Sequence, residues 1–210
     1  MIKKHLKLLL ITSLATLLPM AAGLILWNSL PAQVPFHWNV AGEIDKYASK
    51  AVAVFVMPFV MLALQWVCAF ATAADPKNKE RSGKIVQLVF WIIPVLSNLL
   101  QALVYTAALG WGVRVEVLLP IFLGLVFAVI GNYLPKCKQN YVIGIKLAWT
   151  LHSAENWNRT HRLAGYAWVI GGLLMIATAF LGIFWITLSI IILITLVPIV
   201  YSYALYRKGI

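Results

Sequence analysis

The polar segment from Gly131 to Arg162 carries most of the chemically versatile side chains in the second half of the chain. His152, Glu155 and His161 are titratable, and the first two are three residues apart, about one turn of a helix. Such a group could hold a metal ion or form an acid/base pair, so an enzyme is one hypothesis. The spacing differs from the HExxH pattern of zinc peptidases. For His161 alone, the alternatives are an orienting role beside Trp157 and contact with a partner.

Backbone signals in the same segment predict how it is built. Gly131 and Pro135 end the preceding helix, and Thr150 or Ser153 caps a new helix that starts near Ala154. Nothing breaks the pattern at the end of the segment, so this helix leads directly, or by a sharp bend, into the next apolar run. The residues with candidate roles here are Asn132, Asn140, Gly144, Lys146, Trp149, Thr150, Trp157, His161 and Arg162.

A second polar island lies between Ser29 and Lys50. Its prolines favour extended backbone and Asn39 favours a turn, while its aromatic residues suit the lipid headgroup level, so a small ordered cap is predicted. The candidate contacts for a molecule arriving from solution are His37, Trp38, Asn39, Asp45 and Lys46. The alternative is that the aromatic residues anchor the loop and Asp45 pairs with Lys46 or Lys50.

One face of the apolar run 85–109 carries a polar stripe. Its members, at helical spacing, are Gln87, Trp91, Pro94, Asn98, Gln101 and Tyr105. Because unpaired amides are costly in hydrocarbon, we expect Gln87, Asn98 and Gln101 to face protein or water, with Gln65 as one partner. Hydrogen bonding between helices explains the stripe more simply than a transport pathway, since no charged residue occupies the middle of an apolar run.

These side chains must be positioned by elements that lie in a membrane. Of the 210 residues, 62% are hydrophobic and 11% charged, which leaves too little polar surface for a water-soluble domain. Apolar runs long enough to cross a bilayer lie near 8–27, 51–73, 85–109 and 117–134. A further run, 163–206, is about twice that length and must reverse near Gly182 to Trp185. We predict an all-α, polytopic integral membrane protein with six transmembrane helices.

The distribution of basic residues predicts the orientation. Fourteen of the 17 lysine and arginine residues lie on one side of the predicted spans, and only Lys46, Lys50 and Arg114 lie on the other. The positive-inside rule then places both termini and the segment 131–162 in the cytoplasm. The net charge of +11 is therefore mainly a topology signal, with some attraction to anionic lipid headgroups. Direct nucleic-acid binding is not predicted, because the basic residues are scattered beside spans.

Composition also divides the chain into segments. We predict an N-terminal two-span module, 1–75, with the outer loop 29–50, and a cytoplasmic connector, 76–84. A four-span module, 85–210, follows and carries the cytoplasmic loop 131–162.

The motif in the cytoplasmic loop resembles the SdpI family of immunity proteins from bacterial peptide-toxin systems. A GN-x-x-P turn is followed by further residues in that family's order and spacing; the matching positions are Gly131, Asn132, Pro135, Asn140, Gly144, Trp149, Thr150, Leu151, Trp157, Thr160, His161 and Gly165. The outer-loop pattern LPxxVPxHWNxxGxxDxYxSK is similar to an N-terminal domain of unknown function often joined to SdpI-type domains. The chain departs from the family at Lys146, where the family commonly has arginine. Lysine keeps the charge but lacks arginine's planar bidentate fork.

This resemblance implies resistance to a secreted, membrane-active, SdpC-like peptide toxin, without a cofactor or metal. In the family's best-known member the protein is also thought to be a toxin receptor that holds a cytoplasmic transcriptional repressor at the membrane. The implied partners are the toxin, such a repressor and the lipid bilayer of the bacterial plasma membrane. Two alternatives stay open: a metal-dependent or hydrolytic membrane enzyme that uses His152, Glu155 and His161, and a small-solute transporter.

Overall fold

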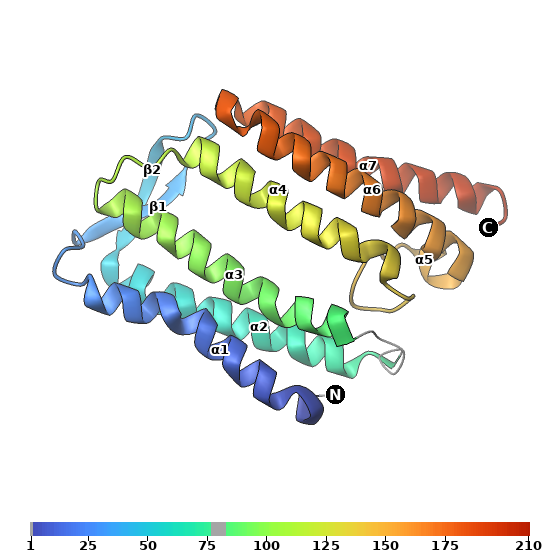
Figure 1. Cartoon of the computed structure of the whole chain (residues 1–210), viewed down its shortest axis with the longest axis horizontal. Coiled ribbons are helices and arrows are strands. Elements are labelled where there is room, and N and C mark those ends of the chain that lie inside the picture. The colour runs from blue at the N-terminus through green and yellow to red at the C-terminus, as the bar shows by residue number, and fades with distance from the viewer. Residues whose placement is uncertain (1, 77–82) are drawn as a thin grey trace. The chain divides into compact units, whose positions relative to one another are not determined.

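The structure is a computed structural model of the chain, and it describes residues 2–76 and 83–210 (Figure 1). Within these residues, six helices are long and apolar enough to cross a membrane. They are α1 (Ile2–Ile25), α2 (Met57–Ala74), α3 (Gly83–Ala108), α4 (Val115–Tyr133), α6 (Ala154–Thr178) and α7 (Phe184–Arg207). The predicted class, an all-α membrane protein with six transmembrane helices, is therefore confirmed.

The long apolar run reverses where the sequence indicates. A short 3-10 turn, η4 (Ala179–Leu181), ends α6, and Gly182 adopts a left-handed conformation with φ of 65°. Glycine occupies this region without the steric cost that a β-carbon brings. The chain then enters α7 at Phe184, and α6 and α7 run side by side (Figure 1).

Segment 29–50, the predicted outer loop, folds as a β-hairpin of β1 (Gln33–Trp38) and β2 (Ile44–Ser49). The strands are antiparallel, with Gln33 opposite Ser49 and Trp38 opposite Ile44, and register shifts interrupt the pairing near His37. A π-helical turn, η1 (Val52–Val56), connects the hairpin to α2. The predicted ordered cap is thus a two-stranded sheet.

The chain divides into two compact units, and the first comprises residues 1–74 and 82–115. It contains α1, the hairpin, η1, α2 and α3. Beneath the hairpin, Leu30 and Val34 pack with Val54 and Tyr105 in an apolar cluster. The hairpin is therefore anchored to the helices by side-chain burial as well as by its two chain connections.

Two prolines explain why amides lie inside this unit. Pro19 in α1 has no N–H for the carbonyl of Ala15, and Asn98 Nδ2 donates to that carbonyl at 2.8 Å. In the π-helical turn, Met57 N donates to the carbonyl of Val52, five residues back. By the same spacing the donor for the Ala53 carbonyl would be Pro58, which has no backbone N–H. Gln101 Nε2 donates to the Ala53 carbonyl instead, at 2.5 Å. The stripe on α3 thus replaces backbone donors that proline removes.

The second unit comprises residues 75–81 and 116–210, and glycines hold α4 against α6 within it. A β-carbon at Gly172 would lie 2.4 Å from the carbonyl oxygen of Gly124, and one at Gly124 would lie 2.5 Å from that of Gly172. Gly131 and Gly165 make a similar approach one to two turns further along. Small residues allow this close packing between membrane helices.

The grouping of α3 differs from the modules expected from sequence. The expected four-span module 85–210 includes α3, whereas in the structure α3 packs with α1 and α2. The reason is the hydrogen bonds from α3 to the carbonyls of Ala15, Pro19 and Ala53. Most of the expected connector 76–84 lies outside the described residues.

Candidate functional site

The loop 137–147 follows a 3-10 turn, η3 (Leu134–Lys136), and is closed by Asn140. This side chain is 1% exposed, and its Nδ2 donates to the carbonyls of Lys138 and Ile143, each at 2.9 Å. Its Oδ1 accepts from the amides of Val142 and Ile143, at 2.9 and 2.7 Å. A buried amide pays a large desolvation cost unless its groups are bonded, and here they are. Asn140 is therefore a structural residue that fixes the loop.

Gly144 brings the loop against α6. Its φ is +113°, and a β-carbon there would lie 2.3 Å from His161 Nε2 and 3.0 Å from the Trp157 ring. Only glycine fits both the backbone conformation and the space. The rings of Trp157 and His161 stack, with centroids 3.9 Å apart, and both side chains are buried. Trp157 Nε1 also donates to the carbonyl of Cys137 at 2.7 Å.

The hydrogen bonds of His161 define its tautomer. Nδ1 lies 2.8 Å from the Trp157 carbonyl, which only accepts, so Nδ1 carries the proton. Nε2 accepts from the backbone amide of Ile145 at 3.0 Å. Both ring nitrogens of the neutral imidazole are thus engaged in holding the loop to α6. In this arrangement His161 has no nitrogen left for a metal or a substrate.

A short helix, α5 (Ala148–His152), packs its aromatic side chain onto α7. Trp149 Nε1 donates to Ser202 Oγ at 2.9 Å, and the Trp149 ring stacks on Tyr206, with centroids 5.6 Å apart. Thr150 is fully buried, accepts from the amide of Leu147 at 2.9 Å and donates to the carbonyl of Ile145 at 2.8 Å. Of the two predicted caps, Ser153 begins α6, where its Oγ accepts from the amide of Asn156. Thr150 instead caps the start of α5.

Sequence reasoning missed two residues of this framework, Asn156 and Ser202. Asn156 is fully buried, and its Nδ2 donates to the carbonyls of Ser202 and Ile210, each at 3.0 Å. Thr160, one turn later, donates to Asn156 Oδ1 at 3.1 Å. The four-residue spacing of two polar residues beside Trp157 was a usable signal for Asn156. Nothing local marks Ser202, because its partners come from α5 and α6.

The nine candidate residues of this loop thus fall into two groups. Six belong to the buried or partly buried framework: Asn140, Gly144, Trp149, Thr150, Trp157 and His161. The other three, Asn132, Lys146 and Arg162, are exposed. Of the nine candidates, these three are the ones whose side chains lie at the surface.

The three titratable residues of the enzyme hypothesis have separate engagements. His152 is exposed and its Nδ1 lies 2.6 Å from the Ala148 carbonyl. Glu155 is exposed and pairs with Arg159 one turn along α6. His161 is buried. Among the described residues, no group of three or more histidine, cysteine, aspartate or glutamate side chains is arranged to hold a metal ion.

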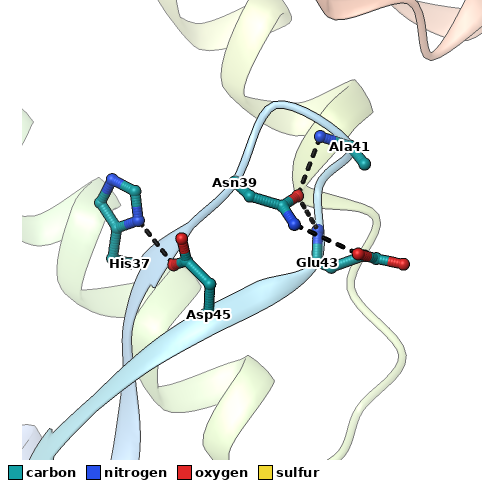
Figure 2. Close-up of polar contacts among 5 residues, drawn as sticks. All are labelled: His37, Asn39, Ala41, Glu43 and Asp45. Carbon is teal, nitrogen blue, oxygen red and sulfur yellow. Dashed lines mark hydrogen bonds and ion pairs between the residues drawn. The ribbon is translucent and has the colours of Figure 1, made fainter.

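Figure 2 shows the second candidate site, the tip of the hairpin. His37 Nδ1 donates to Asp45 Oδ1 at 2.6 Å, across the two strands. Asn39 Oδ1 accepts from the amides of Ala41 and Glu43, and its Nδ2 donates to the Glu43 carboxylate at 3.1 Å. An asparagine that bonds the backbone in this way stabilises a turn. Trp38 is half-buried beside this turn, and Lys46 is exposed.

The expected pairing of Asp45 with a lysine is replaced by the pairing with His37. Lys50 is engaged elsewhere, because its Nζ donates to the carbonyl of Trp27 at 2.9 Å and lies 4.7 Å from the centre of the Trp27 ring. Lys50 thus binds the chain just after α1, near the negative end of that helix dipole. The hydrogen bond from His37 is the main cause that lowers the pKa of Asp45 below its usual 3.8.

Only part of the polar stripe on α3 faces neighbouring elements of the chain. Asn98 and Gln101 bond α1 and η1, as described above, whereas Gln87 and Trp91 are exposed. The suggested pairing of the stripe with Gln65 is corrected. Gln65 is buried and bonds α1, because its Nε2 donates to Thr12 Oγ1 at 2.7 Å and its Oε1 accepts from Thr16. The reason is that Thr12 and Thr16 lie one turn apart on the facing helix.

The fold and these sites define a multi-pass helical membrane protein with a hairpin beside its first helix and a closed polar loop before its fifth span. Residues 136–202 match the SdpI/YfhL protein family, and residues 14–62 match a domain of unknown function, DUF1648. Immunity protein SdpI of Bacillus subtilis (strain 168) is 24% identical over 185 residues, which cover 88% of this chain and 87% of that protein. No solved structure matches the chain. The resemblance to the SdpI family, predicted from the motifs, is confirmed.

Proposed function

We propose that this protein is a membrane immunity protein that protects its cell against a secreted, membrane-active peptide toxin of the SdpC type. The observation that carries the proposal is the similarity to Immunity protein SdpI, which runs through both the DUF1648 and the SdpI/YfhL segments and covers nearly the whole of each chain. A match of this extent must overlap both of these segments. We place the protein in the bacterial plasma membrane, with both termini in the cytoplasm.

We further propose that the hairpin meets the toxin. Its tip is a preorganised structure, because the bonds of Asn39 and the pair of His37 with Asp45 fix the turn before any partner arrives. A rigid element loses little conformational entropy on binding. The exposed side chains of His37, Asp45 and Lys46 supply charge and hydrogen bonding for recognition.

On the other side, the exposed Asn132, Lys146 and Arg162 are our proposed contacts for a soluble partner, such as a cytoplasmic transcriptional repressor. The buried framework of Asn140, Trp157 and His161 would keep the loop in one conformation for that contact. The enzyme alternative has no comparable support, because His152, Glu155 and His161 are separately engaged. The transporter alternative has none either, because no charged residue occupies the middle of an apolar run. The similarity to an immunity protein also favours a non-catalytic role.

The test is to express the protein in toxin-sensitive cells, confirm its membrane insertion, and add an SdpC-like peptide toxin. We expect cells with the protein to survive and keep their membrane potential, while cells with an empty vector lose both. Exchange of the hairpin 29–50 for that of another such protein should change which toxin is tolerated. The variant Lys146→Ala, at an exposed position, should leave survival intact and weaken only the capture of a soluble partner. Loss of potential in cells that carry the inserted wild type would refute the proposal.

A further inference from the structure

A groove of about 530 Å³ lies between α1 and α3, at the ends of these helices nearest the hairpin. Its walls are mainly apolar and include Leu18, Ala22, Ile25 and Trp111. Asn98, Gln101, Tyr105 and Thr106 also line it. The side-chain donors of Gln101, Tyr105 and Thr106 are bonded to backbone carbonyls. The volume lies within the range of known ligand pockets.

Among the described residues, the side-chain oxygen of Asn98 in the groove has no hydrogen-bond partner. Asn98 Nδ2 donates to the carbonyls of Ala15 and Pro94, both at 2.8 Å, which uses both of its hydrogens. Asn98 Oδ1 accepts no hydrogen bond from any described residue, and it is accessible from the groove, since Ser13 Oγ is the only buried, unpartnered side-chain atom of the described residues. An unsatisfied acceptor in hydrocarbon is costly, so the site favours an occupant with a donor.

This requirement separates two occupants. Lipid tails fill the grooves of membrane helices by default, but an acyl chain has no donor for Asn98 Oδ1. An apolar peptide segment has side-chain donors, and the first turn of a peptide helix has free backbone amides. Because lipid tails and apolar peptide side chains are similarly apolar, close packing and this hydrogen bond would decide which of the two occupies the groove.

We propose that this groove seats a membrane-inserted segment of the peptide toxin, with a donor of the peptide bound to Asn98 Oδ1. The inference rests on the proposed immunity function and assigns a site to it. The groove is continuous with the base of the hairpin, because Tyr105, Leu26 and Leu109 line it and also pack in the cluster that contains Leu30 and Val34 of the hairpin segment. A peptide held at the base of the hairpin would therefore lie beside the groove.

The variant Ala102→Trp tests the site by filling it. Ala102 lines the groove and is exposed on α3, so a larger apolar side chain there need not disturb the core. Ala63→Trp is the matched control, because Ala63 is also exposed, on α2, and does not line the groove. We expect Ala102→Trp to lower the tolerated concentration of a synthetic SdpC-like peptide at least tenfold, while Ala63→Trp protects like the wild type.

A photo-crosslinking amino acid at position 102, in membrane vesicles given the same peptide, supplies a readout that does not depend on survival. We expect a peptide adduct from position 102 and none from position 63. Adducts to lipid alone, or full protection by inserted Ala102→Trp, would overturn the groove site while leaving the immunity function standing. Failure of the wild type to protect would instead overturn the proposed function, and this inference with it.

Discussion

At the scale of single residues, the SdpI-like motif is mostly a set of contacts that fold a loop. Gly144 provides the space, Trp157 and His161 provide the stacked surface, and Asn140 closes the backbone. Each of these residues is explained by packing or hydrogen bonding that it makes in the structure. Their identities therefore report on the shape of the loop, and the exposed Asn132, Lys146 and Arg162 are the proposed contacts for a partner.

Gly144→Ala should destabilise the protein both by backbone strain and by steric overlap. A non-glycine residue at a φ of +113° costs about 1–3 kcal/mol. The new β-carbon would also overlap His161 Nε2, and overpacking adds about 1–3 kcal/mol. Thermal unfolding of the purified protein, followed by tryptophan fluorescence, measures the loss. Gly110→Ala is the control, because its φ is +69° and it has open space around it. Equal shifts in the two variants would show that the contact with His161 is unimportant.

The pairing of His37 with Asp45 should be visible in acid. Because the pKa of Asp45 is lowered, the pair stabilises the hairpin at pH values above the usual carboxyl value of 3.8. This stabilisation is lost as the pH falls through the lowered pKa. The titration of the Asp45 carboxyl carbon, followed by NMR, should therefore have a midpoint below 3.8 in the wild type.

Two variants separate the causes of that shift. His37→Ala should move the midpoint of Asp45 up toward 3.8, because the hydrogen bond from His37 is the largest cause. Lys46→Ala should move it less, since the charge of Lys46 is the smallest of the contributing causes. A larger shift in Lys46→Ala than in His37→Ala would contradict the geometry of the pair.

At the scale of elements, helix α3 is joined to α1 and to η1 by side chains that replace missing backbone donors. Asn98 bonds the Ala15 carbonyl that Pro19 leaves free, and Gln101 bonds the carbonyl of Ala53 before Pro58. The crossing of α4 and α6 is achieved differently, by glycines that let the backbones touch. Inside a bilayer both devices matter, because no water is available to satisfy a carbonyl and apolar burial adds little.

A double-mutant cycle tests the link between proline and amide. Asn98→Leu should cost about 1–3 kcal/mol, because the Ala15 carbonyl then has no donor. In a Pro19→Ala background the new backbone N–H supplies that donor, so the same change should cost less. Reversible unfolding in mild detergent gives the four free energies. We expect a coupling of about 0.5–2 kcal/mol, and strict additivity would refute the compensation.

At the scale of the whole molecule, the distribution of basic residues predicts that loop 131–162 faces the cytoplasm and the hairpin faces outward. Single cysteines at Lys46 and Lys146, both exposed, test this in a background without Cys68 and Cys137. A membrane-impermeant maleimide should label position 46 in intact cells and position 146 only after permeabilisation. The reverse pattern would invert the proposed topology and remove the hairpin from contact with a secreted toxin.

The sequence alone determines the class, the number of spans and the position of the last reversal at Gly182, because these depend on composition and on local backbone chemistry. Motif spacing also identifies the loop and the hairpin as the polar parts of interest. Local signals limit this reading, as Asp45 illustrates. Two nearby lysines were the expected partners, whereas the antiparallel pairing of the two strands brings His37 close to Asp45.

The tertiary structure decides which of these residues remain available. Side chains far apart in sequence meet across helices, so Gln65 bonds Thr12 and Thr16, and Ser202 receives Trp149. The same packing withdraws His161 from any metal site and leaves Asn98 Oδ1 open in a groove. Burial and hydrogen-bond geometry are properties of the folded whole, and no one-dimensional pattern contains them.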